Sequence, residues 1–249
     1  MSSRFDPDVQ AFAARAQAIA GVSQLPPPTL PTHIAGWITD RIQFGDFKPG
    51  EAIRELAVAD HFDVSRGPVR EALRLLDRDG LVTLRGRKGA IVRQLSPEET
   101  RSLFLIRAEL FAAQAGLAAA VETPNPAALK AMSDGLDLLK ELANAPQETD
   151  VGQYIMVRRG IATLIVSISG ARYLAKYSRA YENEVAMLWA SILRPERRKA
   201  SAARWAGLCK AIRNGRRGEA ERLARDLVLE SLQEIRRLTV EADGSSPDA

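Results

Sequence analysis

The chain has 249 residues, of which 46% are hydrophobic and 27% charged, a composition typical of a soluble globular protein with one large or two ordinary domains. No apolar run reaches the roughly 18 residues that a membrane-spanning helix needs, and the N-terminus lacks the basic and apolar regions of a secretory signal. The single cysteine, Cys209, excludes an internal disulfide and fits a reducing compartment. We therefore expect a cytoplasmic protein that does not enter the membrane.

Basic residues are concentrated in one stretch of the chain. The formal net charge is only +4, which by itself is weak evidence for any partner. Residues 65–93, however, hold eight basic against three acidic side chains, so that this segment alone carries a net charge of +5. Such clustering is expected of a surface that contacts the phosphates of a nucleic acid.

Residues 1–28 are predicted to be an N-terminal extension. Residues 6–20 are rich in alanine and are able to form a short helix, but their apolar positions are sparse. Three consecutive prolines, Pro26, Pro27 and Pro28, then end any helix and form a stiff extended linker. We expect this extension to be disordered in the free protein.

From residue 29 the spacing of apolar residues indicates helices. A helix is predicted over about 31–44, ended by Gly45, and a turn follows at 47–50. A short helix over 55–61 comes next, and Asp63 tolerates the left-handed backbone of a tight turn. Another helix over about 65–77 completes a pair of short helices. This is the spacing of a helix-turn-helix, in which the second helix contacts DNA bases.

The helix predicted over 65–77 has two different faces. Ser65 is suited to be its N-cap, because a serine hydroxyl accepts hydrogen bonds from the unpaired amides of the first turn. The apolar face carries Val69, Ala72, Leu73 and Leu76, and the opposite face carries Arg66, Arg70, Arg74 and Arg78. Arginine donates to guanine edges and to phosphates in a major groove. Taken alone, this helix is about equally consistent with an ordinary solvated basic surface.

A basic hairpin is predicted after this helix. Residues 81–84 and 90–93 are β-prone runs separated by the segment Arg85-Gly86-Arg87-Lys88-Gly89. A hairpin of this kind beside a DNA-contacting helix is a wing, which follows the DNA backbone or enters the minor groove. A solvated turn is the alternative for the tip, and its position beside the arginine-lined helix makes that alternative weaker.

The second half of the chain is predicted to be an all-α bundle. The segment Ser96-Pro97-Glu98-Glu99 opens a helix with an N-cap, a proline and acidic residues in the first turn. Helical spacing continues through segments at about 97–121, 126–143, 150–169, 171–193, 197–214 and 217–240. The expected fold is therefore mainly α: an extension (1–28), a winged helix-turn-helix domain (29–95), a six-helix bundle (96–240) and a disordered tail (241–249).

Residues 30–95 resemble the winged helix of the GntR family of bacterial transcription regulators. The resemblance rests on the segments at 45–50, 58–59, 64–73, 75–76 and 80–82 and on Gly89. It implies contacts to DNA bases or phosphates from Arg66 and Arg70, and contact with the minor groove around Gly89. Together with the arginine pattern it leads us to assign DNA binding to Arg54, Ser65, Arg66, Gly67, Arg70, Arg74, Arg87, Lys88 and Gly89.

Two positions depart from the pattern of that family. The family often has threonine where Gly67 stands, so a hydroxyl contact to phosphate is missing here. It often has arginine where Leu56 stands, and the neighbouring Arg54 is a candidate to replace it. Both differences concern the DNA sequence that is recognised and leave the fold undisturbed.

The helical half is similar to the FCD effector domain of the FadR-like subgroup, mainly over residues 161–174 and 210–215. In that family an aspartate and three histidines hold a divalent metal, which binds an organic acid. Here the only histidines are His33 and His61, both in the first half of the chain. The resemblance places Arg158, Ala162, Trp205 and Asp226 at the positions of the metal ligands, so neither a metal nor another cofactor is expected.

We hypothesise that Arg158, helped by Arg107, takes the place of the metal as the cationic group. Ala162 and Trp205 would then line an apolar wall, with Asp226 at the remaining ligand position. A guanidinium pairs bidentately with a carboxylate, so a small organic acid is the expected effector. The alternative, given nearly equal weight, is that Arg158 lies at the surface or in an ion pair between helices and that the pocket has collapsed.

The predicted function is that of a homodimeric repressor that binds a pseudo-palindromic double-stranded DNA operator and is released by a small acidic effector. A ligand-independent regulator with a vestigial pocket is the main alternative. An enzyme is a weak third hypothesis, because the helical half has no histidine, the lone cysteine has no visible histidine partner and no phosphate-binding loop is present. No catalytic residue is therefore assigned.

Overall fold

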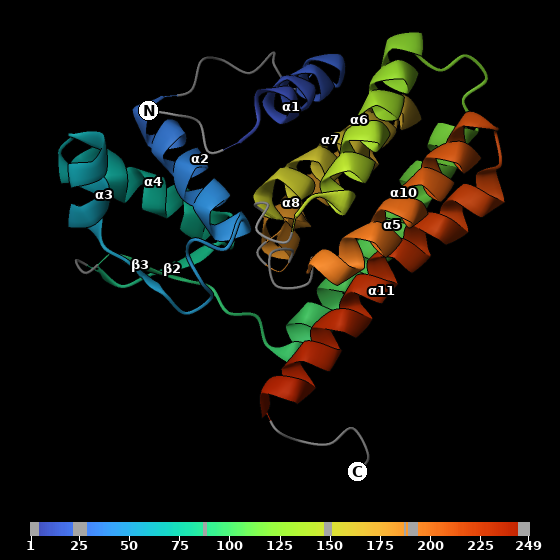
Figure 1. The fold of residues 1–249 in the computed structure, drawn as a ribbon. Coiled ribbons are helices and arrows are strands. Elements are labelled where there is room, and N and C mark those ends of the chain that lie inside the picture. Colours follow the sequence, from blue (N-terminus) through green and yellow to red (C-terminus); the bar gives the residue numbers. More distant parts are fainter. Residues whose placement is uncertain are drawn as a thin grey trace.

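The computed structural model describes residues 5–21, 29–86, 89–146, 151–186, 188 and 194–243. Two hydrophobic cores form within these residues, one in the N-terminal winged part and one in the helical bundle. Figure 1 shows the winged part on one side of the bundle, with the short sheet below α3 and α4. The mainly α fold that the sequence indicates is confirmed.

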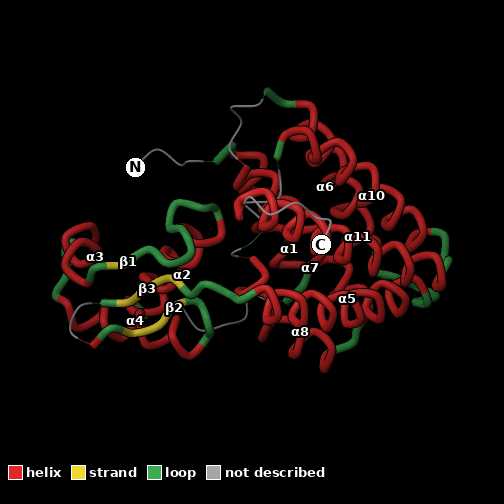
Figure 2. The backbone as a smooth tube through the Cα atoms, turned by 90° about the horizontal axis from the view of Figure 1, so that it is seen from below, coloured by secondary structure: helices red, strands yellow, loops and turns green. Residues whose placement is uncertain are grey.

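The winged part contains α2 (Leu30–Gln43), β1 (Ala52–Ile53), α3 (Glu55–Phe62), α4 (Arg66–Arg78), β2 (Val82–Leu84) and β3 (Ala90–Val92). Its strands form an antiparallel sheet in the order β1-β3-β2, with Ile53 opposite Ala90 and Thr83 opposite Ile91. Asp63 adopts the predicted left-handed conformation (φ 52°) and ends α3, which turns the chain sharply into α4. Figure 2 shows α4 alongside the sheet.

The bundle consists of α5 (Pro97–Ala119), α6 (Pro126–Asn144), α7 (Val151–Ser169), α8 (Arg172–Ala186), α10 (Pro195–Arg213) and α11 (Arg217–Asp243). Ser96 and Glu99 form a capping box that begins α5 where the sequence predicts it. One predicted end is wrong in detail, and another cannot be compared with the structure. Helix α8 is described as far as Ala186, so its predicted end at 193 lies outside the described residues, and α11 continues through 241–243, which we had placed in a disordered tail.

The N-terminal extension contains an ordered helix, contrary to the expected disorder. Helix α1 (Pro7–Ile19) is capped by the Asp6 side chain and packs against α6 and α7. Its three buried side chains are Val9, Phe12 and Ala16. The Phe12 ring enters a notch at Gly135 and Gly160, where an added Cβ would lie within 2.5 Å of the ring. The apolar residues of α1 are few, but they share one face and meet a matching groove.

Helices α5 and α7 are long and apolar enough to cross a membrane by length and composition alone. In the structure, 56% of the apolar window of each helix is buried inside the bundle. Both are the core helices of a folded domain, which pass the same compositional test.

Candidate functional site

Helix α4 has the two faces that the sequence predicts. Val69, Ala72, Leu73 and Leu76 are buried, whereas Arg66, Arg74 and Arg78 are exposed. Ser65 occupies the N-cap position, but its hydroxyl makes no capping hydrogen bond, so that detail of the prediction is wrong. A physical reason is that Pro68, the third residue of the helix, has no N–H to donate. The Ser65 residue is instead exposed beside Arg66 and Gly67.

Arg70 forms an ion pair within the protein that the sequence did not reveal. Its Nε and Nη2 atoms donate to the two carboxylate oxygens of Glu55, at 3.1 and 2.9 Å. Glu55 is only 4% exposed at the start of α3. The Arg70 hydrogen bonds hold the pKa of Glu55 below its usual range. Arg70 therefore clamps α3 to α4, while 46% of its side chain remains exposed.

The start of α3 lies beside this clamp. Arg54 is the N-cap residue of α3 and is exposed, as a DNA contact requires. Leu56 is 52% exposed, an unusual value for leucine, at the position where the family often has arginine. These two residues extend the exposed surface of α4 onto the first helix of the helix-turn-helix.

The wing is closed by a hydrogen bond from the Arg85 N–H to the Gly89 carbonyl oxygen (2.8 Å). Gly89 is buried, and a Cβ at this position would lie 2.2 Å from the Ile53 carbonyl oxygen. Gly89 therefore has a packing role in the wing, and its predicted contact with DNA stays a prediction. Arg87 and Lys88, also assigned to DNA binding, lie outside the described residues.

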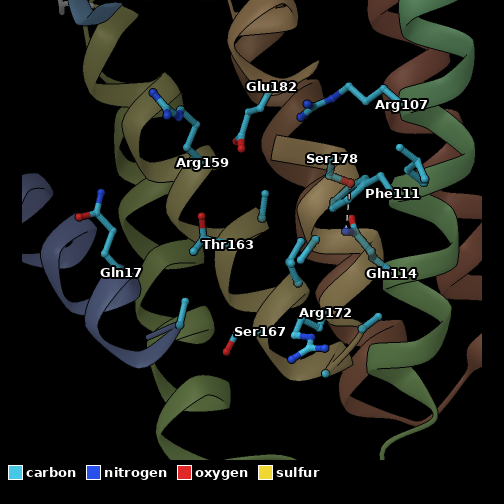
Figure 3. Close-up of a pocket in the computed structure, with 17 residues that line it drawn as sticks. Gln17, Arg107, Phe111, Gln114, Arg159, Thr163, Ser167, Arg172, Ser178 and Glu182 are labelled. Atoms are coloured by element: carbon cyan, nitrogen blue, oxygen red, sulfur yellow. Dashed lines mark hydrogen bonds between the residues drawn. The ribbon is translucent and has the colours of Figure 1, made fainter. Parts of the chain in front are cut away.

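A cavity of about 560 Å³ lies between α1, α5, α7 and α8. Figure 3 shows Arg107 of α5, Arg159 of α7 and Glu182 of α8 near one end, with Arg172 toward the other. Apolar side chains, among them Phe111, line the wall between the ends. The remaining lining residues are Gln17, Ala20, Leu110, Gln114, Ala162, Thr163, Val166, Ser167, Gly170, Ala171, Ala175 and Ser178.

The guanidinium groups at one end of the cavity influence each other. Burial lowers the pKa of Arg107; the Glu182 carboxylate opposes this shift and the Arg159 charge adds to it. On the α5 side, Gln114 Nε2 donates to Ser178 Oγ at 3.0 Å and ties α5 to α8. The cavity is therefore a mixed site, with cationic groups, hydrogen-bonding groups and apolar walls.

The predicted effector residues divide into three groups. Arg107 and Ala162 line the cavity. Arg158 and Trp205 lie beside it around a second space of about 20 Å³, enough for one water molecule. Arg158 is 6% exposed and its guanidinium lies 5.5 Å from the Trp205 ring centroid. Burial lowers the pKa of Arg158 to about 10, so it remains charged at neutral pH. The surface position that we weighed for Arg158 is therefore wrong.

Asp226 is not part of the cavity lining. It lies on α11, is 43% exposed and pairs with Arg222 at 3.3 Å. Helix α11 packs chiefly against α5 and α10, whereas the cavity is walled by α1, α5, α7 and α8. A shared sequence position therefore did not place this carboxylate at the site.

Sequence reasoning missed Arg159, although its neighbour Arg158 was selected. The signal was present, because Arg159, Ala162, Thr163, Val166 and Ser167 follow the spacing of one helical face, and all five line the cavity. Ala162 was already a candidate, so the helical period starting from it would have selected Arg159. Gln17 was unpredictable by this route, since it belongs to α1.

Three or more His, Cys, Asp or Glu side chains do not gather as a potential metal site anywhere in the part of the chain that the structure describes. His33 and His61 belong to an aromatic cluster in the winged part. The His61 ring stacks on Trp37 at 4.5 Å, and His33 meets Phe62 edge-on.

A winged helix-turn-helix is a DNA-binding architecture, and in this chain it is followed by a helical bundle that has a cavity. The sequence pattern of "Bacterial regulatory proteins, gntR family" matches residues 30–92, and that of the FCD domain matches residues 102–230, about half of the chain. The protein therefore belongs to the GntR family of bacterial regulators and carries an FCD domain.

Curated relatives agree with this assignment. The chain is 31% identical to the HTH-type transcriptional regulator YdhC of Bacillus subtilis over 52% of its own length and 56% of that protein. It is 34% identical to the transcriptional repressor GlaR of Escherichia coli over 34% of its length and 38% of GlaR. The first curated relatives are thus matched over about half of their length.

The same fold occurs in solved structures. E. coli McbR/YncC superposes with a TM-score of 0.71 at 18% identity, covering 86% of this chain and 99% of that chain. A GntR regulator from Rhodococcus gives a TM-score of 0.65 at 22% identity, covering 85% and 98%. At these identities the likeness concerns the fold alone.

Proposed function

We propose that this protein is a cytoplasmic transcriptional repressor that binds a pseudo-palindromic operator as a homodimer. The observation that carries the proposal is the exposed arginine face of α4, which stands on a buried apolar face next to a wing. In a helix-turn-helix this second helix enters the major groove. Arg66 and Arg70 are proposed to contact base edges, and Arg74, Arg87 and Lys88 to contact phosphates. The proposed units are residues 29–95 for DNA binding and 96–240 for effector binding and dimerisation.

Exposed apolar side chains on the bundle support dimerisation. Leu105 and Ile106 on α5 and Tyr173 and Tyr177 on α8 are exposed in the single chain. Helices α5 and α8 pack against each other, so these side chains offer a surface for a second copy. A two-fold dimer would place its α4 helices about 34 Å apart, one turn of DNA.

The proposed effector is a small organic acid that binds in the cavity without a metal. The volume of about 560 Å³ is in the range of small-molecule sites. Arg107 and Arg159 supply positive charge at one end of the cavity. Guanidinium groups pair bidentately with carboxylates, and the apolar wall suits the body of such an acid. Arg158 and Trp205 would support this end from behind.

A regulator without an effector remains the second candidate. The observation in its favour is Glu182, whose carboxylate already lies at the cationic end and favours the charged form of Arg107. This resident carboxylate partly balances the arginines, as in a site that has lost its ligand. A thermal-shift screen with organic acids separates the two candidates, because a true effector raises the melting temperature by mass action.

The experiment that tests the DNA-binding proposal is footprinting of the intergenic DNA beside the gene. We expect protection of two half-sites about one helical turn apart. Arg66→Ala should then weaken binding to this site by about 1–3 kcal/mol, and binding to random duplex much less. Equal losses on both duplexes would show that Arg66 only neutralises phosphate, and an unprotected region would contradict an operator there.

A further inference from the structure

Arg159 lies where the cavity meets the DNA-binding part of the molecule. It stands on α7 and lines the cavity near Arg107 and Glu182 (Figure 3). The same guanidinium reaches out of the bundle, because its Nη1 donates to Oε1 of Gln43, the last residue of α2. Its charge also acts on Asp40, one turn earlier in α2. The Arg159 side chain therefore lines the cavity and also contacts the DNA-binding part.

Helix α2 connects this contact to the DNA-binding part. Its buried side chains Ile34, Ile38 and Ile42 belong to the same core as Leu73 and Leu76 of α4, so α2 and α4 move as one body. At the end of α2, Phe44 enters the core of the bundle and meets Phe5 at 4.9 Å. A change at Gln43 therefore occurs where the winged part is attached to the bundle.

We propose that Arg159 couples the cavity to the DNA-binding part, and that an anionic ligand in the cavity competes with Gln43 and Asp40 for its guanidinium. This inference rests on the acidic effector proposed above and adds the way in which that effector would act. Ligand binding then weakens the hold of the bundle on the end of α2 and changes the orientation of α4. The two α4 helices of a dimer would no longer fit one operator.

The chemistry favours the ligand in this competition. Gln43 is neutral, and a charge-assisted bidentate pair between guanidinium and carboxylate is roughly twice as strong as a neutral hydrogen bond. Asp40 is the charged competitor. Although Asp40 as a residue keeps contact with solvent, packing around its carboxyl raises its pKa, and the Arg159 charge opposes that rise. Asp40 thus acts on Arg159 through its charge, whereas Gln43 accepts a hydrogen bond from it.

The ligand and Gln43 should affect each other equally, because coupling between two equilibria is reciprocal. If ligand binding releases Gln43, then removing the Gln43 side chain should favour ligand binding. Gln43 does not line the cavity, so a change in affinity there would have to pass through Arg159. Gln43→Ala should therefore tighten the binding of an anionic ligand about fivefold, at the lower end of typical allosteric couplings.

The contact itself is tested without any ligand, by hydrogen–deuterium exchange of the full-length protein. Arg159→Ala and Gln43→Ala should each speed exchange of the amides at residues 40–46. The matched control is Arg172→Ala, which removes another arginine of the cavity lining, on α8. Exchange at 40–46 that is the same in Arg159→Ala, Gln43→Ala and wild type would overturn the coupling, whatever the effector is.

The competition is tested by calorimetry with butyrate, succinate and benzoate as probes. We expect a probe that binds wild type to bind Arg159→Ala at least about tenfold more weakly, the loss of one charged pair, and Gln43→Ala more tightly. Equal affinity for wild type and Gln43→Ala would overturn the coupling and leave the effector proposal standing. If no probe binds wild type, the acidic effector and the release by it are both contradicted, and the exchange result still decides whether the contact holds α2.

Discussion

At the scale of single residues, Arg70 and Glu55 serve both the fold and the proposed DNA contact. The buried Glu55 carboxylate needs a cationic partner, and Arg70 supplies it from the helix that is proposed to enter the major groove. Arg70→Ala would therefore disturb the arrangement of α3 and α4 as well as any base contact. Its effect on DNA binding is interpretable only beside its effect on thermal stability, so Arg66→Ala is the cleaner probe.

The Glu55–Arg70 pair predicts a pH dependence of stability. The ordinary pKa of glutamate is near 4.5, and the Arg70 hydrogen bonds lower that of Glu55 in the folded state. A group with a lowered pKa stabilises the fold above its unfolded pKa, and this stabilisation is lost as pH falls through the folded pKa. We expect Glu55→Gln to melt below wild type at pH 7, and the difference to shrink below about pH 4.5.

Calorimetric melting between neutral and acidic pH checks this prediction. Glu71→Gln is the control, because it removes a carboxylate from an exposed position on α4, next to Arg70 in the sequence. A difference between Glu55→Gln and wild type that stays constant at every pH would show that the pair does not stabilise the fold through charge.

Gly89 allows a second prediction at the residue scale. It has a φ of +97°, and a Cβ would lie 2.2 Å from the Ile53 carbonyl oxygen, a backbone atom held in the sheet. Gly89→Ala should cost at least the roughly 1–3 kcal/mol of a strained residue and also push the wing away from β1. We expect a lower melting temperature and weaker DNA binding.

Gly86→Ala is the matched control in the same wing. Gly86 also has a positive φ (+59°), but an added Cβ would meet nothing within 4 Å. Only the strain of about 1–2 kcal/mol for a left-handed residue should then appear. Equal losses for the two variants would mean that the close approach to Ile53 has no energetic consequence.

At the scale of elements, α1 shows how a terminal helix becomes part of a site. Phe12 holds it in the notch at Gly135 and Gly160, and Gln17 and Ala20 at its end line the cavity. An exposed ion pair, Arg15–Asp134 at 2.7 Å, adds little by comparison. The part of the cavity wall that α1 supplies is thus held by the contact of Phe12 with α6 and α7, which are far from α1 in the sequence.

Phe12→Ala should release α1 from the bundle. A buried Phe→Ala change costs about 3–5 kcal/mol in a rigid core. The cost falls on the state in which α1 is docked, because the undocked helix has no contact to lose. We expect faster trypsin cleavage after Arg15, with a smaller change in the melting of the rest of the protein. Ala14→Ser, at an exposed position of the same helix, is the control. Unchanged cleavage in Phe12→Ala would contradict this role for the ring.

At the scale of the whole molecule, the proposed repressor needs two chains, and exposed apolar side chains on α5 and α8 are the candidate contact. Replacing Ile106 and Tyr177 by glutamate would place charge within that surface. We expect sedimentation of wild type at about twice 27.2 kDa and of the double variant near 27.2 kDa. Leu30→Glu, an exposed apolar position on α2, should remain dimeric. A double variant that stays dimeric would place the interface elsewhere.

Much of the fold was predictable because its signals are local. Helix periodicity, the capping box at Ser96 and the left-handed Asp63 depend on residues within a few positions of one another. The arginine face of α4 is predictable for the same reason. The packing of α1 on the bundle was not predictable, because its few apolar residues find their partners only at the glycines of α6 and α7.

The sequence by itself determined the helices, the wing and the arginine-lined helix, since each is encoded in short-range spacing. Only the tertiary structure decided that Arg158 lies beside the cavity and not in its lining, that Asp226 lies away from it, and that Arg70 holds Glu55. The physical reason is that these contacts join segments far apart in the chain. Their geometry depends on how helices pack, which no local pattern of residues specifies.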